Sequence, residues 1–175
     1  MPVDAWVMAA LGRFVTMKGH RILLDALARL PAEVAGRPWR LILLGDGPLR
    51  SALMRQAAEL GVAERLVWVG WQRVPGPYLQ LADLIVFPSL AYEPFGNVIL
   101  DAWAWEKPLL ATRFFGALEV VRHGEDGCCV PCEDPPALAD GIQLLLGDDP
   151  LRAALARHGA KRAAAEFGEQ AIMAQ

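Results

Sequence analysis

Short, unbroken apolar runs alternate along the chain with longer segments in which apolar residues recur at helical spacing. Ile22, Leu23, Ala26, Leu27 and Leu30, for example, would share one face of a helix. Continuous apolar runs, in contrast to alternating ones, are typical of strands that are buried on both faces of a parallel sheet. The pattern predicts six strands, at residues 5–12, 39–45, 65–70, 84–89, 108–112 and 127–131.

A helical segment follows each predicted strand. The segments lie at residues 20–30, 49–61, 77–83, 97–106 and 116–124, with two closing helices at 135–148 and 150–167. Because strand and helix alternate throughout, we predict an α/β fold: a doubly wound, mostly parallel six-stranded sheet with helices on both faces. A length of 175 residues corresponds to about one domain, so residues 1–175 are expected to form a single domain.

Composition narrows the class of protein. Hydrophobic residues make up 54% of the chain and charged residues 21%, which is typical of a globular protein. The formal net charge is −3 and no basic stripe stands out, which argues against a nucleic-acid partner. The N-terminus lacks the pattern of a signal peptide, and no run of about 18 apolar residues could span a membrane.

Three cysteines, Cys128, Cys129 and Cys132, cluster near the last predicted strand. An odd, clustered set argues against a disulfide framework and favours a reducing compartment. A metal site would need a second group of ligands, and no Cys or His cluster follows. We therefore interpret these cysteines as small apolar residues at a strand end, and expect no bound metal there.

Ligands of a doubly wound sheet bind beyond the carboxyl ends of its strands. Arg13 and Lys18 follow the first predicted strand. Elsewhere in a fold, such a pair would ordinarily be interpreted as two solvated surface cations. At the carboxyl end of a strand, however, the guanidinium fork of Arg and the point charge of Lys suit a diphosphate. Other candidate residues at the same edge are Gly12, Gly45, Trp71 and the segment 89–97.

The stretch "EPFGNVIL" adds a helix N-terminus to this edge. We predict Asn97 as the N-cap, with Gly96 allowing a ligand to approach the backbone closely. The free N–H groups of a first helical turn form an anion site. Glu93 and Asp101 flank this turn, and their carboxylates could accept hydrogen bonds from a sugar on one side and a ribose on the other.

Several enzyme classes fit the sequence poorly. The G-x-G-x-x-G fingerprint of dinucleotide-dependent dehydrogenases is absent after the first predicted strand. Neither Ser51 nor Ser89 lies in the G-x-S-x-G elbow of hydrolases. No H-E-x-x-H or comparable metal spacing occurs, and His123 is better explained as a loop residue than as a base.

The motifs also carry a family resemblance. In order and spacing, they resemble the C-terminal, donor-binding domain of the group 1 (family 4) glycosyltransferases of the GT-B fold, nearly from end to end. The matching pieces include "LGRFVTMKGHRILLDAL", "LILLGDGPLRSAL", "LADLIVFPSLAYEPFGNVILDAWA" and "GALEVVRHGEDGCCVPCEDPPALADGI". The resemblance implies a Rossmann-like half of the GT-B fold that binds a nucleoside-diphosphate sugar. It also implies sugar transfer with retention at the anomeric carbon, without a bound metal.

The resemblance implies roles for particular residues. Arg13 and Lys18 match the basic pair that holds the donor diphosphate, and Glu93 matches the first acid of the Glu-x7-Glu motif, which contacts the donor sugar. These three are the expected catalytic residues. Asp101 stands where the family usually has the second Glu of that motif, which binds the ribose, so the sequence departs from the family at this position. The remaining expected donor-binding residues are Gly12, Gly45, Trp71, Phe95, Gly96 and Asn97.

A GT-B enzyme has two such domains, with the acceptor glycan or lipid on the N-terminal one. We therefore expect this chain to be an excised or truncated half that binds donors weakly and transfers nothing efficiently alone. The sequence of the stretch "EPFGNVILDAWA" resembles that of bacterial envelope and lipopolysaccharide glycosyltransferases. This resemblance implies a cytoplasmic parent protein with peripheral contact at the inner membrane. Two alternatives stay open: a nucleotide-binding module without activity, and a nucleotide-sugar 2-epimerase, which would need its acids and a His placed differently.

Overall fold

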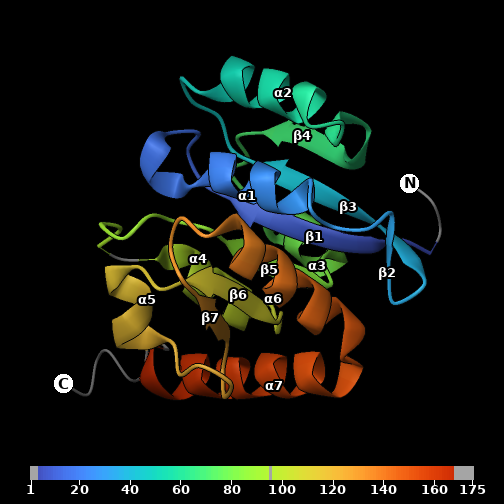
Figure 1. The fold of residues 1–175 in the computed structure, drawn as a ribbon. Coiled ribbons are helices and arrows are strands. Elements are labelled where there is room, and N and C mark those ends of the chain that lie inside the picture. Colours follow the sequence, from blue (N-terminus) through green and yellow to red (C-terminus); the bar gives the residue numbers. More distant parts are fainter. Residues whose placement is uncertain (1–3, 95, 168–175) are drawn as a thin grey trace.

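The computed structural model describes residues 4–94 and 96–167, in which strands and helices alternate (Figure 1). The strands are β1 Trp6–Leu11, β2 Glu33–Val34, β3 Arg37–Leu44, β4 Leu66–Gly70, β5 Leu84–Phe87, β6 Leu109–Thr112 and β7 Cys128–Val130. The helices are α1 His20–Leu27, α2 Arg50–Glu59, α3 Gly76–Leu81, α4 Asn97–Ala104, α5 Phe115–Val120, α6 Pro135–Gly147 and α7 Asp149–Glu166. Two 3-10 turns, η1 Thr16–Lys18 and η2 Ala63–Arg65, complete the list.

Six strands form the predicted parallel sheet, in the order β4-β3-β1-β5-β6-β7. This is the order of a doubly wound fold, and it confirms the predicted fold class. The chain reverses its winding at β1, which lies between β3 and β5. Ligand sites of such folds lie at this switch point, outside the carboxyl ends of the strands.

The short strand β2 was not predicted. It pairs antiparallel with the start of β3, with Val34 opposite Arg37. The two residues between the strands, Ala35 and Gly36, both have positive φ, at 49° and 74°. This is the backbone of a two-residue hairpin turn, and Ala35 gives it little sequence signal because Ala rarely adopts such a φ.

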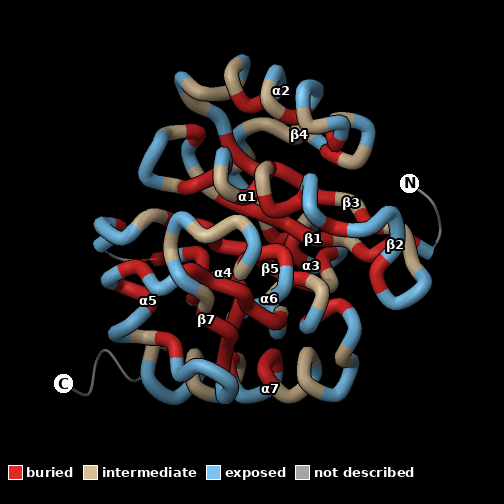
Figure 2. Tube along the Cα trace, viewed as in Figure 1, coloured by how far each residue is buried: buried red, intermediate tan, exposed pale blue. Residues whose placement is uncertain are grey.

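The core lies on both faces of the sheet. Met8, Leu41 and Leu43 face one apolar cluster, which α1, α2 and α6 cover. Their neighbours Ala9, Ile42 and Leu44 face a second cluster, beneath α3, α4 and α5. Figure 2 shows the central strands β1, β3, β5 and β6 as mostly buried segments, whereas the edge strand β4 is mostly intermediate in burial. Burial on both faces explains why the strands read as continuous apolar runs.

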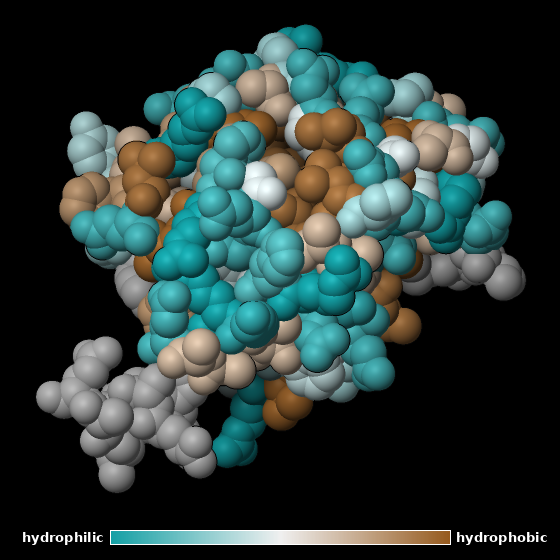
Figure 3. All heavy atoms as spheres, turned by 90° about the horizontal axis from the view of Figure 1, so that it is seen from below, coloured by the Kyte–Doolittle hydropathy of each residue, from teal (hydrophilic) through white to brown (hydrophobic). Residues whose placement is uncertain are grey.

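Helix α7 closes the β7 side of the molecule and packs against α4. Trp103 of α4 is fully buried, and a Cβ at Gly159 of α7 would lie 2.2 Å from its ring. Arg162 of α7 forms an ion pair with Asp126, with Nη1 2.7 Å from Oδ2, and its guanidinium carbon lies 5.4 Å from the centre of the Trp103 ring. Hydrophilic side chains cover most of the face seen from the α7 side (Figure 3). None of the helices within residues 4–94 and 96–167 is long and apolar enough to cross a membrane.

Candidate functional site

The loops that follow β1 and β3 are in direct contact at the switch point. The Gly12 N–H donates to the Leu44 carbonyl at 3.0 Å, and the Phe14 N–H donates to the Asp46 carbonyl at 2.9 Å. Gly45 has φ +152°, and a Cβ there would lie 1.9 Å from the Gly12 carbonyl oxygen. Only glycine allows this approach. The contact fixes the loop that carries Arg13 over the ends of the central strands.

An ion pair joins the β1 loop to the loop after β5. Lys18 Nζ lies 2.6 Å from Glu93 Oε2, and the two side chains are 22% and 7% exposed. Gly19, next to Lys18, has φ +65°, and a Cβ there would lie 1.8 Å from the Pro88 carbonyl oxygen. The Leu90 N–H also donates to the Met17 carbonyl at 2.8 Å. The two loops are therefore bound together by backbone contact, and Lys18 reaches Glu93 as a result.

A pocket of about 270 Å³ opens between α4 and the loops that follow β1, β3 and β4. It brings together five of the residues predicted from the sequence: Gly12, Arg13, Gly45, Trp71 and Asp101. The pocket adjoins the Lys18–Glu93 pair, because a Cβ at Gly12 would lie only 3.4 Å from the Lys18 side chain. Its other lining residues are Leu11, Leu44, Asp46, Gln72, Pro75 and Val98.

The pocket holds one cation and one carboxylate, Arg13 and Asp101, whose charges are not engaged in ion pairs within residues 4–94 and 96–167. Among the described residues, no carboxylate forms an ion pair with Arg13 and no cation forms one with Asp101. Asp101 is half-buried, and this burial raises the pKa of its carboxyl above the ordinary value. Arg13 can therefore bind an anion, and Asp101 can accept a hydrogen bond from a hydroxyl group.

The start of α4 differs from the prediction. Asn97 is the first residue of the helix, Gly96 is its N-cap, and no side chain caps it, so the prediction of an Asn97 cap was wrong. A Cβ at Gly96 would lie 2.5 Å from the Phe87 ring, so packing forces glycine into the cap position. Asn97 is exposed beside Val98, which lines the pocket. Phe95, also predicted to lie against the donor, falls outside the described residues.

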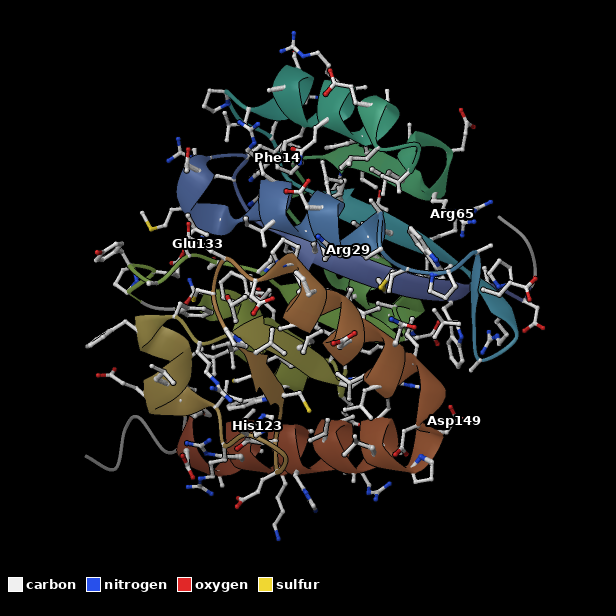
Figure 4. The ribbon with its side chains drawn as sticks, viewed as in Figure 1. Phe14, Arg29, Arg65, His123, Glu133 and Asp149 are labelled. Atoms are coloured by element: carbon white, nitrogen blue, oxygen red, sulfur yellow. The ribbon has the colours of Figure 1, made fainter. Side chains whose placement is uncertain are left out.

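A buried histidine follows Lys18 and Gly19. His20 is 4% exposed, and neither of its ring nitrogens has a hydrogen-bond partner among the described residues. Its ring packs edge-on against Phe14, which lies between α1 and β4 (Figure 4). Burial, with a smaller contribution from the Lys18 charge, lowers the pKa of His20 to about 4. The imidazole is therefore neutral at pH 7.

The cysteine cluster has the environment of a structural element. Cys128 and Cys129 are buried, and burial raises the pKa of Cys129 to about 11, so its thiol stays protonated and unreactive at neutral pH. The Cys129 N–H donates to His123 Nδ1 at 2.9 Å, which gives this loop histidine a structural partner beside α7 (Figure 4). Within the described residues, no three His, Cys, Asp or Glu side chains gather as a metal site would require.

A larger hollow of about 460 Å³ lies beside α7, away from the strand ends. Its central cation, Arg162, is already neutralised by Asp126 at 2.7 Å and Glu166 at 2.9 Å. This network ties α7 to the loop before β7. The pocket at the switch point is the stronger candidate, because it lies at the carboxyl ends of the strands, where ligands of this fold bind.

Sequence reasoning missed some of the site. It did not single out Pro75 and Val98, which line the pocket. It included Ser89 in the candidate segment 89–97 without a role, and the structure shows that its hydroxyl donates to Glu93 Oε2 at 3.3 Å. Ser89 carries a usable signal, since it is a polar residue directly beyond a buried strand. Pro75 and Val98 carry none, because apolar residues at such positions are equally typical of the core.

The switch point, the close glycine contacts between its loops and the two cations define an α/β domain whose pocket is suited to an anionic ligand. The sequence model of the family described as "Glycosyl transferases group 1" matches residues 6–148. The chain is 39% identical over 171 residues to the lipopolysaccharide core biosynthesis glycosyltransferase LpsE of Rhizobium meliloti, covering 98% of this chain and 48% of LpsE. The chain thus belongs to the group 1 glycosyltransferases.

Solved structures show the same fold. Anabaena HepE, crystallised with UDP and glucose, superposes with a TM-score of 0.86 at 29% identity, over 98% of this chain and 48% of HepE. The C-terminal domain of a group 1 glycosyltransferase from Francisella tularensis superposes with a TM-score of 0.83 at 20% identity, over 94% of this chain and 87% of that one. The chain spans about half the length of the curated relatives that it matches.

Proposed function

We propose that this chain is the donor-binding domain of a glycosyltransferase and that its switch-point pocket binds a nucleoside-diphosphate sugar. The observation that carries the proposal is the placement of Arg13 and Lys18 at one strand end, beside a pocket lined by Asp101. Two cations suit a diphosphate, and a half-buried carboxylate suits a ribose hydroxyl. The Anabaena relative, which was crystallised with UDP and glucose, supports this ligand class.

In this proposal Glu93 contacts the donor sugar, while Arg13 and Lys18 hold the diphosphate and stabilise it as the leaving group. Fixed charges that face a developing negative charge account for much of the catalysis of such reactions. The proposal assigns this work to the two cations and invokes no metal ion. Phe95, Gly96 and Asn97 are assigned to the backbone segment against the sugar and phosphate.

The activity of a whole protein containing this domain is also a proposal. We infer that such a parent transfers the sugar with retention, that a second domain binds the acceptor, and that this chain alone transfers little. The names of the Rhizobium relatives support an acceptor in lipopolysaccharide core synthesis, and with it a cytoplasmic parent in peripheral contact with the membrane. An assay of the parent that finds free epimerised nucleotide sugar, and no acceptor product, would contradict this assignment.

Calorimetric titration of the chain with UDP, GDP and ADP tests the binding proposal. We expect one of them to bind, and expect Arg13→Ala and Lys18→Ala each to weaken it by about 1–3 kcal/mol, the range for a charge-assisted contact. Arg55→Ala is the matched control, because Arg55 is exposed on α2 and lies outside the pocket. Unchanged affinity in both pocket variants would contradict the phosphate assignment.

A further inference from the structure

A column of buried polar side chains lies beneath the Glu93 carboxylate. Thr112, at the end of β6, and Ser89, just beyond β5, are both 0% exposed. The Thr112 hydroxyl donates to the Ser89 carbonyl, and the Cys132 thiol contacts the same oxygen at 3.7 Å. The Ser89 hydroxyl in turn lies 3.3 Å from Glu93 Oε2. The column thus runs from the sheet to the carboxylate of the proposed site.

Two described side chains donate to Glu93, and both reach the same oxygen. Lys18 approaches Oε2 at 2.6 Å and Ser89 approaches it at 3.3 Å. A carboxylate accepts but does not donate, so the serine hydroxyl must be the donor. The two donors differ in freedom: Lys18 is a long side chain at a 22% exposed surface position, whereas Ser89 is buried and has one rotatable side-chain bond before its oxygen.

This difference matters when a ligand binds. The Lys18 ammonium cannot give its full interaction to the diphosphate and to Glu93 at once, so a bound diphosphate weakens its hold on the carboxylate. Ser89 keeps its position, because Thr112 and Cys132 hold its carbonyl on the side of the sheet. A buried hydroxyl with a fixed backbone can orient a carboxylate at low entropic cost.

We propose that Ser89 is a positioning residue, which holds the Glu93 carboxylate toward the donor sugar while Lys18 engages the diphosphate. This inference rests on the proposed function, since it needs Glu93 to face the sugar. It makes a selective prediction. Loss of the Ser89 hydroxyl should weaken binding of a sugar conjugate and should leave binding of the bare nucleoside diphosphate almost unchanged.

The test is calorimetric titration of the chain with UDP and with UDP-glucose, for the wild type and Ser89→Ala. Ser51→Ala is the matched control, because Ser51 is the other serine of the chain and is exposed on α2. We expect Ser89→Ala to bind UDP within about twofold of the wild type and to lose about fivefold to tenfold in affinity for UDP-glucose, the equivalent of one hydrogen bond. Ser51→Ala should alter neither value.

A second variant separates positioning from folding. Thr112→Val removes the donor that fixes the Ser89 carbonyl and keeps the Ser89 hydroxyl. We expect Thr112→Val to shift the UDP-glucose to UDP affinity ratio in the same direction by a smaller factor, and Thr112→Ser to restore the ratio. If Ser89→Ala does not fold, the same comparison in the Thr112 variants decides the matter.

The outcomes distinguish this inference from the proposed function. A wild-type chain that binds neither UDP nor UDP-glucose would overturn both for these ligands. A wild-type chain that binds both, with a Ser89→Ala variant that keeps the affinity ratio or loses both affinities equally, would overturn only the positioning role of Ser89.

Discussion

The buried imidazole of His20 should make the protein sensitive to acid. The perturbation is His20→Leu, which replaces a polar ring by an apolar side chain at a 4% exposed position. In the folded protein the ring nitrogens have no partner among the described residues, and the pKa of His20 falls from 6.5 to about 4. In the unfolded chain the same ring is solvated and takes up its proton near pH 6.5.

The magnitude follows from proton linkage. Between pH 6.5 and pH 4 the unfolded state binds a proton that the folded state does not, so the free energy of unfolding falls as the pH falls. A pKa lowered from 6.5 to about 4 corresponds to a loss of about 3 kcal/mol across this window, at about 1.4 kcal/mol for each pH unit. Above pH 6.5 the ring is neutral in both states and contributes no pH dependence.

Urea unfolding of the wild type and His20→Leu, followed by tryptophan fluorescence across this pH range, measures the effect. Other groups titrate in both proteins, so the quantity of interest is the difference between the two curves. We expect the variant to gain stability relative to the wild type as the pH falls, by about 3 kcal/mol at pH 4. His158→Gln, at an exposed position on α7, is the control for loss of an imidazole. Parallel curves for the wild type and His20→Leu would refute the reasoning.

Two further predictions concern the loops of the site. Gly19→Ala should lower the free energy of unfolding by well over the about 1–2 kcal/mol that a left-handed alanine costs, because its Cβ would lie 1.8 Å from the Pro88 carbonyl oxygen. The control Gly36→Ala, at φ +74° with nothing within 4 Å of its Cβ, should cost only that amount. Equal losses of stability in chemical denaturation would contradict the contact between Gly19 and Pro88. Glu93→Gln removes the charge that competes for Lys18, so UDP should bind up to about tenfold more tightly, and unchanged or weaker binding in calorimetry would contradict such competition.

Local sequence was sufficient to predict those features of the protein that depend on residues close together in the chain. Unbroken apolar runs such as that of β3 predicted strands buried on both faces, and the fold class follows from their alternation with helices. Because ligands of this fold bind at strand ends, the same pattern pointed to Arg13, Gly45 and Trp71, which the structure places around one pocket.

The tertiary structure decided what depends on contacts between distant segments. The pairing of Lys18 with Glu93 arises because the sheet order places β5 beside β1, and no local periodicity encodes that neighbour. The same holds for the burial of His20 against Phe14. At Asn97 a good capping residue stands one position inside α4, and the cap position is taken by Gly96, where a Cβ would clash with the Phe87 ring. Propensity acts within one segment, whereas packing between segments fixes which atoms meet.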